Sequence, residues 1–157
     1  MDFQRNELGG WIVPDGTTLP PGTVVPSYSR IGDYCRIDND CRIDNDCRIG
    51  YDCTIDNGCS IGDGCSIGDD CSIGNYCTIG YGCTWLGVQV YKWLTLANVD
   101  GSGRQLKVVV AVDGSVKVEA GCFVGTADEF CKKAAAEGKG TYVAVVRAVV
   151  QALTSKE

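Results

Sequence analysis

Hydrophobic positions in the first half of the chain recur every six residues. Nine cysteines follow one another at that spacing, and an isoleucine stands two residues after each of the first eight, from Ile37 to Ile79. The nine are Cys35, Cys41, Cys47, Cys53, Cys59, Cys65, Cys71, Cys77 and Cys83. Trp85 takes the isoleucine place after the ninth. Because neither a helix nor a strand has a period of six, the pattern indicates a structural repeat.

The repeat extends upstream of the first cysteine. Val13, Leu19, Val25 and Ile31 continue the aliphatic position, so that twelve hexads run from Val13 to Thr84. After the aliphatic residue of each hexad stand mostly Asp, Asn, Gly or Pro, which favour turns. Each hexad therefore predicts a short strand and a corner, and the hexads must stack to bury their apolar side chains.

Units such as Ile61-Gly-Asp-Gly-Cys65-Ser and Ile67-Gly-Asp-Asp-Cys71-Ser resemble the hexapeptide-repeat family, whose members fold as a left-handed parallel β-helix. The resemblance implies that three hexads form one triangular coil, so that twelve hexads form four coils. It also implies a homotrimer, because trimers are common in this family. It does not specify function, since the family includes acyltransferases, carbonic-anhydrase-like proteins and non-catalytic members.

The pattern changes after Trp85, where the period of six ends. Apolar segments separated by turn signals such as Asp113-Gly114 predict a three-stranded antiparallel meander. A capping box, Thr126-Ala-Asp-Glu129, then predicts a helix, and a later apolar run predicts a second one. The expected strands are 88–99, 105–112 and 115–119, and the expected helices are 126–137 and 141–153. The predicted fold class is mainly β: a left-handed parallel β-helix followed by a small α+β domain.

Three regions follow from these patterns: an N-terminal cap at 1–12, the β-helix at 13–85, and an α+β domain for oligomerisation or interaction at 86–157. Trp11 and Trp85 are expected to cover the two ends of the β-helix. The second predicted helix is apolar on nearly all sides, so we expect its burial to need a partner subunit.

The regular placement of the cysteines beside isoleucine predicts free, buried thiols that fill the core. Structural zinc sites use shorter Cys-x2-4-Cys spacings, so no metal is expected. Three thiols per coil that face one axis leave a soft metal ion as the alternative. Stacked cysteines would lie about 4.8 Å apart, a spacing that is compatible with disulfide formation on oxidation in air.

No histidine occurs in the chain. The acyltransferases of the hexapeptide-repeat family use a histidine as general base, and its carbonic-anhydrase-like members bind metal through histidines. Histidine is also the usual general base near neutral pH. We therefore expect no enzymatic activity and no cofactor, although the abundant aspartates leave carboxylate catalysis formally open.

Acidic residues dominate the repeat. Residues 31–84 hold ten Asp and three Arg, a net charge of −7, within a total of −6 for the chain. Such a surface should repel nucleic acid, so no direct nucleic-acid binding is expected. It can instead imitate nucleic acid toward a basic partner, or serve only to keep the protein soluble.

Three arginines are the candidate ligand-binding residues: Arg36, Arg42 and Arg48. Because they are six residues apart, they would ring one coil with one on each face, and in a trimer they could grip a phosphate or carboxylate. The alternative is that they neutralise nearby aspartates. A structural ladder at one corner is expected from asparagines eighteen residues apart: Asn39, Asn57 and Asn75.

These features favour a non-catalytic oligomer that works by binding. The segment Gly121-Cys-Phe-Val-Gly-Thr-Ala-Asp-Glu-Phe130 resembles a tail on repeat proteins encoded by phages and prophages. That resemblance suggests a viral inhibitor that contacts a host defence protein. One alternative is a protein that sequesters a small anionic ligand, such as a nucleotide, between its subunits, and another is an inert structural oligomer. The N-terminal residues do not resemble a signal peptide and no apolar run of about 18 residues occurs, so we expect a cytoplasmic protein without a membrane span.

Overall fold

The computed structural model describes residues 2–121 and 123–155. The chain divides into two units, Met1–Gly87 and Val88–Glu157.

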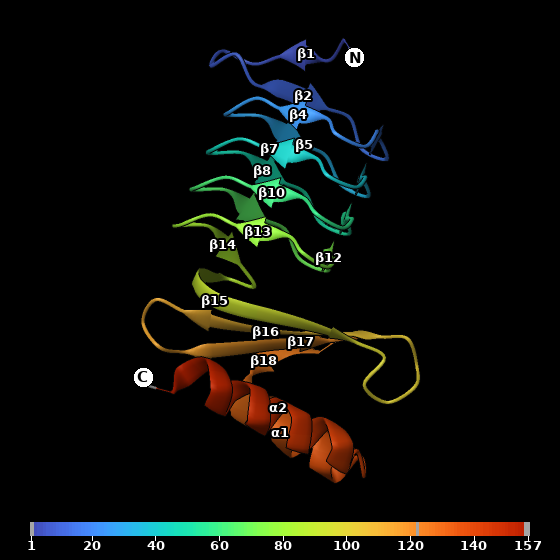
Figure 1. The fold of residues 1–157 in the computed structure, drawn as a ribbon, viewed down its shortest axis with the longest axis vertical. Coiled ribbons are helices and arrows are strands. Elements are labelled where there is room, and N and C mark those ends of the chain that lie inside the picture. The colour runs from blue at the N-terminus through green and yellow to red at the C-terminus, as the bar shows by residue number, and fades with distance from the viewer. Residues whose placement is uncertain (1, 122, 156–157) are drawn as a thin grey trace. The chain divides into compact units, whose positions relative to one another are not determined.

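The first unit is a β-solenoid in which a short strand recurs every six residues, at each junction between hexads and at the two ends of the repeat (Figure 1). The strands are β2 (Trp11–Val13), β3 (Thr18–Leu19), β4 (Val24–Val25), β5 (Arg30–Ile31), β6 (Arg36–Ile37), β7 (Arg42–Ile43), β8 (Arg48–Ile49), β9 (Thr54–Ile55), β10 (Ser60–Ile61), β11 (Ser66–Ile67), β12 (Ser72–Ile73), β13 (Thr78–Ile79) and β14 (Thr84–Trp85). A further strand, β1 (Gln4–Arg5), pairs antiparallel with β2.

Every third strand pairs with its neighbour in a parallel sheet. The strand orders are β2-β5-β8-β11-β14, β3-β6-β9-β12 and β4-β7-β10-β13. Partners lie eighteen residues apart, as in Ile37 with Ile55. Three hexads therefore form one coil, and the predicted architecture of about four coils is confirmed. The left hand of the coil stays a prediction.

Aliphatic and cysteine side chains fill the interior of the solenoid. The nine repeat cysteines are all buried, and so are the aliphatic residues from Val13 to Ile73 that follow the strand register. Trp85, in the last of these positions, is also fully buried. The core is thus built from columns of identical or similar residues eighteen apart, because parallel in-register pairing places like over like.

Each corner contains a residue with left-handed backbone conformation. This residue precedes the inward cysteine or its equivalent, and its φ lies between 54° and 76° in all twelve hexads. The twelve are Gly16, Gly22, Tyr28, Tyr34, Asp40, Asp46, Asp52, Gly58, Gly64, Asp70, Tyr76 and Gly82. Gly and Asp tolerate this conformation at low cost, whereas tyrosine does not. The three tyrosines therefore occupy the corner despite the backbone requirement.

The second unit is an antiparallel sheet with two helices. Its strands are β15 (Val88–Ala97), β16 (Gln105–Ala111), β17 (Val116–Ala120) and β18 (Phe123–Thr126), and its helices are α1 (Ala127–Ala136) and α2 (Gly140–Thr154). The predicted capping box is present, since the Thr126 hydroxyl accepts from the Glu129 amide and the Glu129 carboxylate accepts from the Thr126 amide. The three-stranded meander was incomplete, because β18 adds a fourth strand that pairs with β17.

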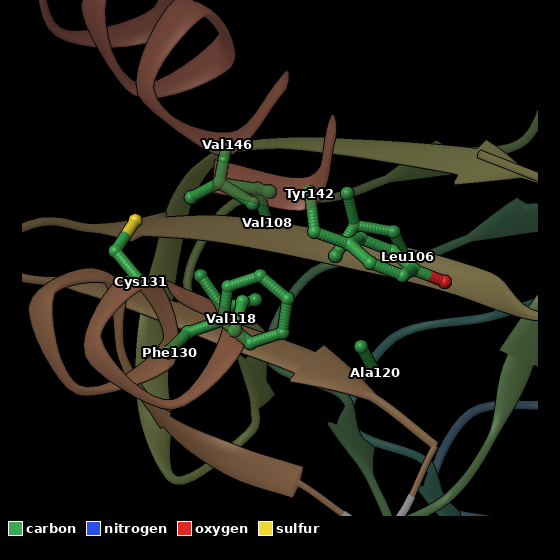
Figure 2. Close-up of a cluster of buried hydrophobic side chains, with 9 residues drawn as sticks. Leu106, Val108, Val118, Ala120, Phe130, Cys131, Tyr142 and Val146 are labelled. Carbon is green, nitrogen blue, oxygen red and sulfur yellow. The ribbon is translucent and has the colours of Figure 1, made fainter. Parts of the chain in front are cut away.

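Both helices pack on one face of this sheet. Leu106 and Val118 from the strands form a buried cluster with Phe130 of α1 and with Tyr142 and Val146 of α2 (Figure 2). Much of the apolar surface of α2 therefore packs within its own unit, and burial against a partner subunit stays a prediction. In the described part of the chain, no helix combines the length and apolarity that a bilayer span requires.

Candidate interaction surface on the solenoid

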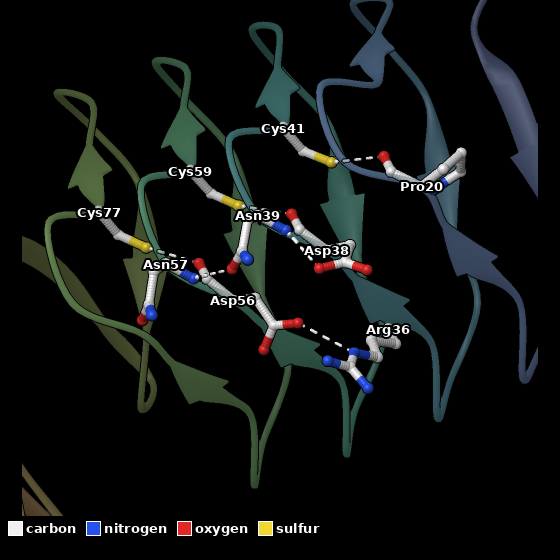
Figure 3. Close-up of polar contacts among 9 residues, drawn as sticks. All are labelled: Pro20, Arg36, Asp38, Asn39, Cys41, Asp56, Asn57, Cys59 and Cys77. Atoms are coloured by element: carbon white, nitrogen blue, oxygen red, sulfur yellow. Dashed lines mark hydrogen bonds and ion pairs between the residues drawn. The ribbon is translucent and has the colours of Figure 1, made fainter.

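The nine repeat cysteines are bound to the backbone of the preceding coil. Each Sγ donates to a carbonyl oxygen 21 residues earlier, for example Cys41 to Pro20 at 3.3 Å and Cys77 to Asp56 at 3.1 Å (Figure 3). All nine are free thiols. Among the described residues, no group of three or more Cys, Asp or Glu has the arrangement of a metal site. The contacts of the nine cysteines are those of residues that pack in the core.

Neighbouring thiols in a column influence one another. Burial raises the pKa of Cys35. The hydrogen bond with the Cys47 thiol, together with burial, raises the pKa of Cys65 to about 11. Interaction with the neighbouring Cys59 thiol lowers the pKa of Cys77 to about 7. Cys77 is also the most exposed of the nine, at 8 %.

Asparagine side chains form the ladder that the spacing predicted. The backbone amide of Asn57 donates to Oδ1 of Asn39 at 3.1 Å (Figure 3). The backbone amide of Asn75 donates in the same way to Oδ1 of Asn57 at 2.8 Å. Aspartates do the same at the other two corners, as in Tyr51 N to Asp33 Oδ1 at 3.0 Å. Sequence reasoning missed this second use of aspartate, although the spacing of eighteen was the signal for it.

The three candidate arginines lie on three different sheets of the solenoid. Arg36 pairs with Asp56 at 2.9 Å (Figure 3), and Arg42 pairs with Asp44 at 3.0 Å. Arg48 lies on β8 and has no ion-pair partner within residues 2–121 and 123–155. A single subunit therefore does not bring the three guanidinium groups together.

A different pair of arginines shares one face. Arg30 on β5 is the direct register partner of Arg48 on β8. Sequence reasoning missed Arg30, because serine rather than cysteine precedes it in the repeat. The two arginines lie in a shallow groove of about 550 Å³ that Tyr51 and Ser66 also line. Like charges directly opposite one another destabilise a sheet. A bound anion would therefore relieve the repulsion between Arg30 and Arg48.

One corner of the solenoid carries five aspartates and two tyrosines, and we name it the acidic edge. Its members fall into two columns of residues eighteen apart: Asp15, Asp33, Tyr51 and Asp69 in one, and Tyr34, Asp52 and Asp70 in the other. None of these five carboxylates has an ion-pair partner among the described residues. The acidic edge borders the groove, since Asp15, Asp33 and Asp69 also line it.

Two tyrosine rings of the acidic edge pack against each other. The rings of Tyr34 and Tyr51 meet edge to face with centroids 5.4 Å apart. They remain 60 % and 46 % exposed. The nearby Asp33 carboxylate raises the pKa of Tyr51, so that its hydroxyl stays protonated and can donate a hydrogen bond. Paired, exposed aromatic rings beside unpaired charges are typical of protein-binding surfaces.

Comparison with known proteins gave one match. The family described as "Bacterial transferase hexapeptide (six repeats)" matches residues 52–84. Searches of curated proteins and of solved structures gave no match. The matched residues lie within the β-solenoid, and this part of the chain is therefore similar to the hexapeptide-repeat family.

Proposed function

We propose that this chain is a non-catalytic binding protein that contacts a basic protein partner through the acidic edge. The observation that supports this most is the set of five carboxylates that form no ion pair with any described residue and lie beside the Tyr34–Tyr51 pair. Tyrosine supplies contact area at interfaces, and complementary charge speeds association. By covering a functional basic surface, the protein would inhibit its partner, which fits the role of a viral inhibitor of a host defence protein.

The inventory of reactive groups supports a non-catalytic role. The chain has no histidine, and the repeat thiols are buried and hydrogen-bonded to the backbone. The aspartates of the corners serve the turns and ladders. The matched family includes transferases, and in the resemblance drawn above those enzymes depend on a histidine base that this chain lacks.

A homotrimer is part of the proposal. Hexapeptide-repeat proteins often trimerise, and three copies of the acidic edge would raise the apparent affinity for a partner with repeated basic sites. Light scattering after size exclusion, under reducing conditions, tests this point directly. A monomer would remove the trimer from the proposal and leave the acidic edge to be tested alone.

Charge-neutral variants test the acidic edge. Asp52→Asn with Asp70→Asn removes two charges from the edge, and both positions have the left-handed backbone that Asn tolerates. Asp40→Asn with Asp46→Asn is the matched control, because it removes two charges from the same kind of position at the other corners. We expect host proteins captured by the wild type and by the control to be lost from the edge variant. Equal capture by all three proteins would contradict the proposal.

The Arg30–Arg48 pair favours a second candidate function, the sequestration of a small anion. Two neighbouring guanidinium groups that form no ion pair with the described residues can together hold a phosphate or carboxylate, although Asp15, Asp33 and Asp69 line the same groove. Native mass spectrometry of gently purified protein would reveal a bound mass that Arg30→Gln with Arg48→Gln abolishes. Arg36→Gln with Arg42→Gln is the matched control, because those arginines already pair with aspartates. Retention of the mass in the first variant would exclude this site.

A further inference from the structure

The second unit contains a small cavity with an aromatic wall. Its volume is about 210 Å³, and residues of α1, of the first turn of α2 and of the sheet line it. The ring of Phe130 lies 5.4 Å from that of Phe123 and 5.8 Å from that of Tyr142, which it meets edge to face. Figure 2 shows the Phe130 and Tyr142 rings in the buried cluster. One side of the cavity is therefore apolar and fixed by packing.

A buried hydroxyl without a partner belongs to this cavity. Tyr142 is only 3 % exposed, and its hydroxyl has no hydrogen-bond partner in the described part of the chain. Burial, followed by the charge of nearby Asp100, raises the pKa of Tyr142. The phenol is therefore a proton donor at neutral pH. Native proteins usually satisfy such a group, so the hydroxyl points to an acceptor that a ligand would supply.

Three basic side chains line the same cavity, while the Asp100 carboxylate lies near the Tyr142 hydroxyl. Arg104, Lys133 and Lys139 line it, and the one acid of its lining, Glu137, already pairs with Lys139 at 3.5 Å. Arg104 packs so closely over Gly121 that a Cβ there would lie 3.1 Å from Nη1. The absence of a side chain at Gly121 thus leaves room for the Arg104 guanidinium beside it.

The N-terminus of α2 adds to the positive charge beside the cavity. The helix has 15 residues, its first turn contains no acid, and its N-cap residue Lys139 makes no side-chain capping hydrogen bond. The amino end of a helix carries partial positive charge and favours anions. Lys133 lies with Nζ 5.6 Å from the centre of the Phe123 ring. Aromatic and cationic groups therefore both line this cavity.

We propose that this cavity binds a small aromatic carboxylate. Its ring would pack against Phe123 and Phe130, and its carboxylate would accept from the Tyr142 hydroxyl and pair with Arg104, whose planar fork suits a carboxylate. Ligand pockets for drug-sized molecules usually span about 300–1,000 Å³, so this cavity is too small for a nucleotide. The site lies in the second unit and does not depend on the acidic edge.

Titration of the reduced full-length protein with benzoate tests the proposal. In NMR spectra we expect benzoate, at up to about 10 mM, to shift the signals of Phe123, Phe130 and Tyr142. Benzyl alcohol keeps the ring without the charge, and acetate keeps the charge without the ring. Each should bind about ten-fold or more weakly than benzoate, because each lacks one of the two recognised groups. Absence of benzoate-induced shifts, or equal binding of benzyl alcohol, would overturn the assignment.

Three variants make the test specific to the cavity. Tyr142→Phe keeps the ring and removes the donor, so we expect about ten-fold weaker benzoate binding with thermal stability unchanged or raised. Lys133→Gln should weaken binding several-fold, whereas Lys132→Gln, its sequence neighbour outside the lining, should not. Unchanged benzoate affinity in Tyr142→Phe would show that the hydroxyl does not serve a ligand, and would refute the proposal.

Discussion

The Sγ of Cys59 donates a hydrogen bond to the carbonyl oxygen of Asp38, one coil earlier, at 3.2 Å. The same bond recurs in all nine repeat cysteines, with distances from 3.0 to 3.3 Å. A thiol is a weak donor, yet each bond satisfies a carbonyl oxygen and links successive coils. Cysteine therefore combines the size of a small apolar residue with an inter-coil contact that alanine cannot make.

The first prediction concerns this contact. Cys59→Ala should lower the free energy of unfolding by about 1–2 kcal/mol, through a small cavity and the lost hydrogen bond. Urea unfolding of reduced protein, followed by circular dichroism, measures the change. Ser60→Ala is the control, because its side chain faces outward and we expect a change below about 0.5 kcal/mol. Equal effects of the two substitutions would show that the thiol bond contributes nothing.

The second prediction concerns thiol reactivity and pH. Iodoacetamide should modify Cys77 before Cys41 and Cys59 of the same column, because Cys77 is more exposed and its pKa is lowered to about 7. The thiolate is the reactive form. The rate at Cys77 should therefore rise as the pH increases through about 7 and fall below it. Timed alkylation with peptide mass spectrometry checks the order, and equal rates for all three at each pH would instead indicate reaction through unfolding.

The solenoid could be predicted because its period is visible in the chain itself. Ile37 to Ile79 and the cysteines between them fix which side chains face inward, and the strands follow. The strand β18 could not be predicted with equal ease. Phe123–Thr126 is short and contains Gly125, and it leads directly into the capping box. Its pairing with β17 depends on tertiary packing, which overrides weak local propensity.

The candidate surface could not be predicted from residues close in the sequence. The pairing of Arg30 with Arg48 and the acidic edge appear only when the chain is wound at eighteen residues per coil. The spacing of six residues predicts Arg36, Arg42 and Arg48 as one set. Only Arg48 lies beside Arg30, whereas Arg36 and Arg42 lie on other faces and pair with Asp56 and Asp44. Surface clusters of this kind have no local period, so the sequence alone does not separate them from ordinary corner residues.

The third prediction concerns the asparagine ladder. Asn57→Ala should reduce stability by about 1 kcal/mol, because the Asn75 backbone amide loses its acceptor. Asn57→Asp should retain most of the stability, because Asp33 and Asp63 accept the equivalent backbone amides at the other corners. Thermal and urea unfolding of the two variants give the comparison. A similar loss in both would mean that the amide group acts through some other contact.

The fourth prediction concerns a buried ion pair in the second unit. Lys107 on β16 pairs with its cross-strand partner Glu119 on β17, and both side chains are buried. Lys107→Met should cost about 3–5 kcal/mol, because it leaves a buried carboxylate without its counter-charge. Combining it with Glu119→Leu should recover most of that loss. A double-mutant cycle of unfolding free energies tests this, and a double variant as unstable as the single one would contradict it.

Because the strands pair in parallel register, inserting residues into the solenoid affects its core and its surface differently. The inward columns repeat the same isoleucine and cysteine on every face, so a tandem duplication of six codons would leave each core residue among equivalent neighbours. The outward residues repeat only after a full coil of eighteen. The same duplication would carry every downstream aspartate and tyrosine to the next corner and split the acidic edge. Insertions of six residues can thus lengthen the core during evolution, whereas only insertions of eighteen residues keep the surface residues on the same face.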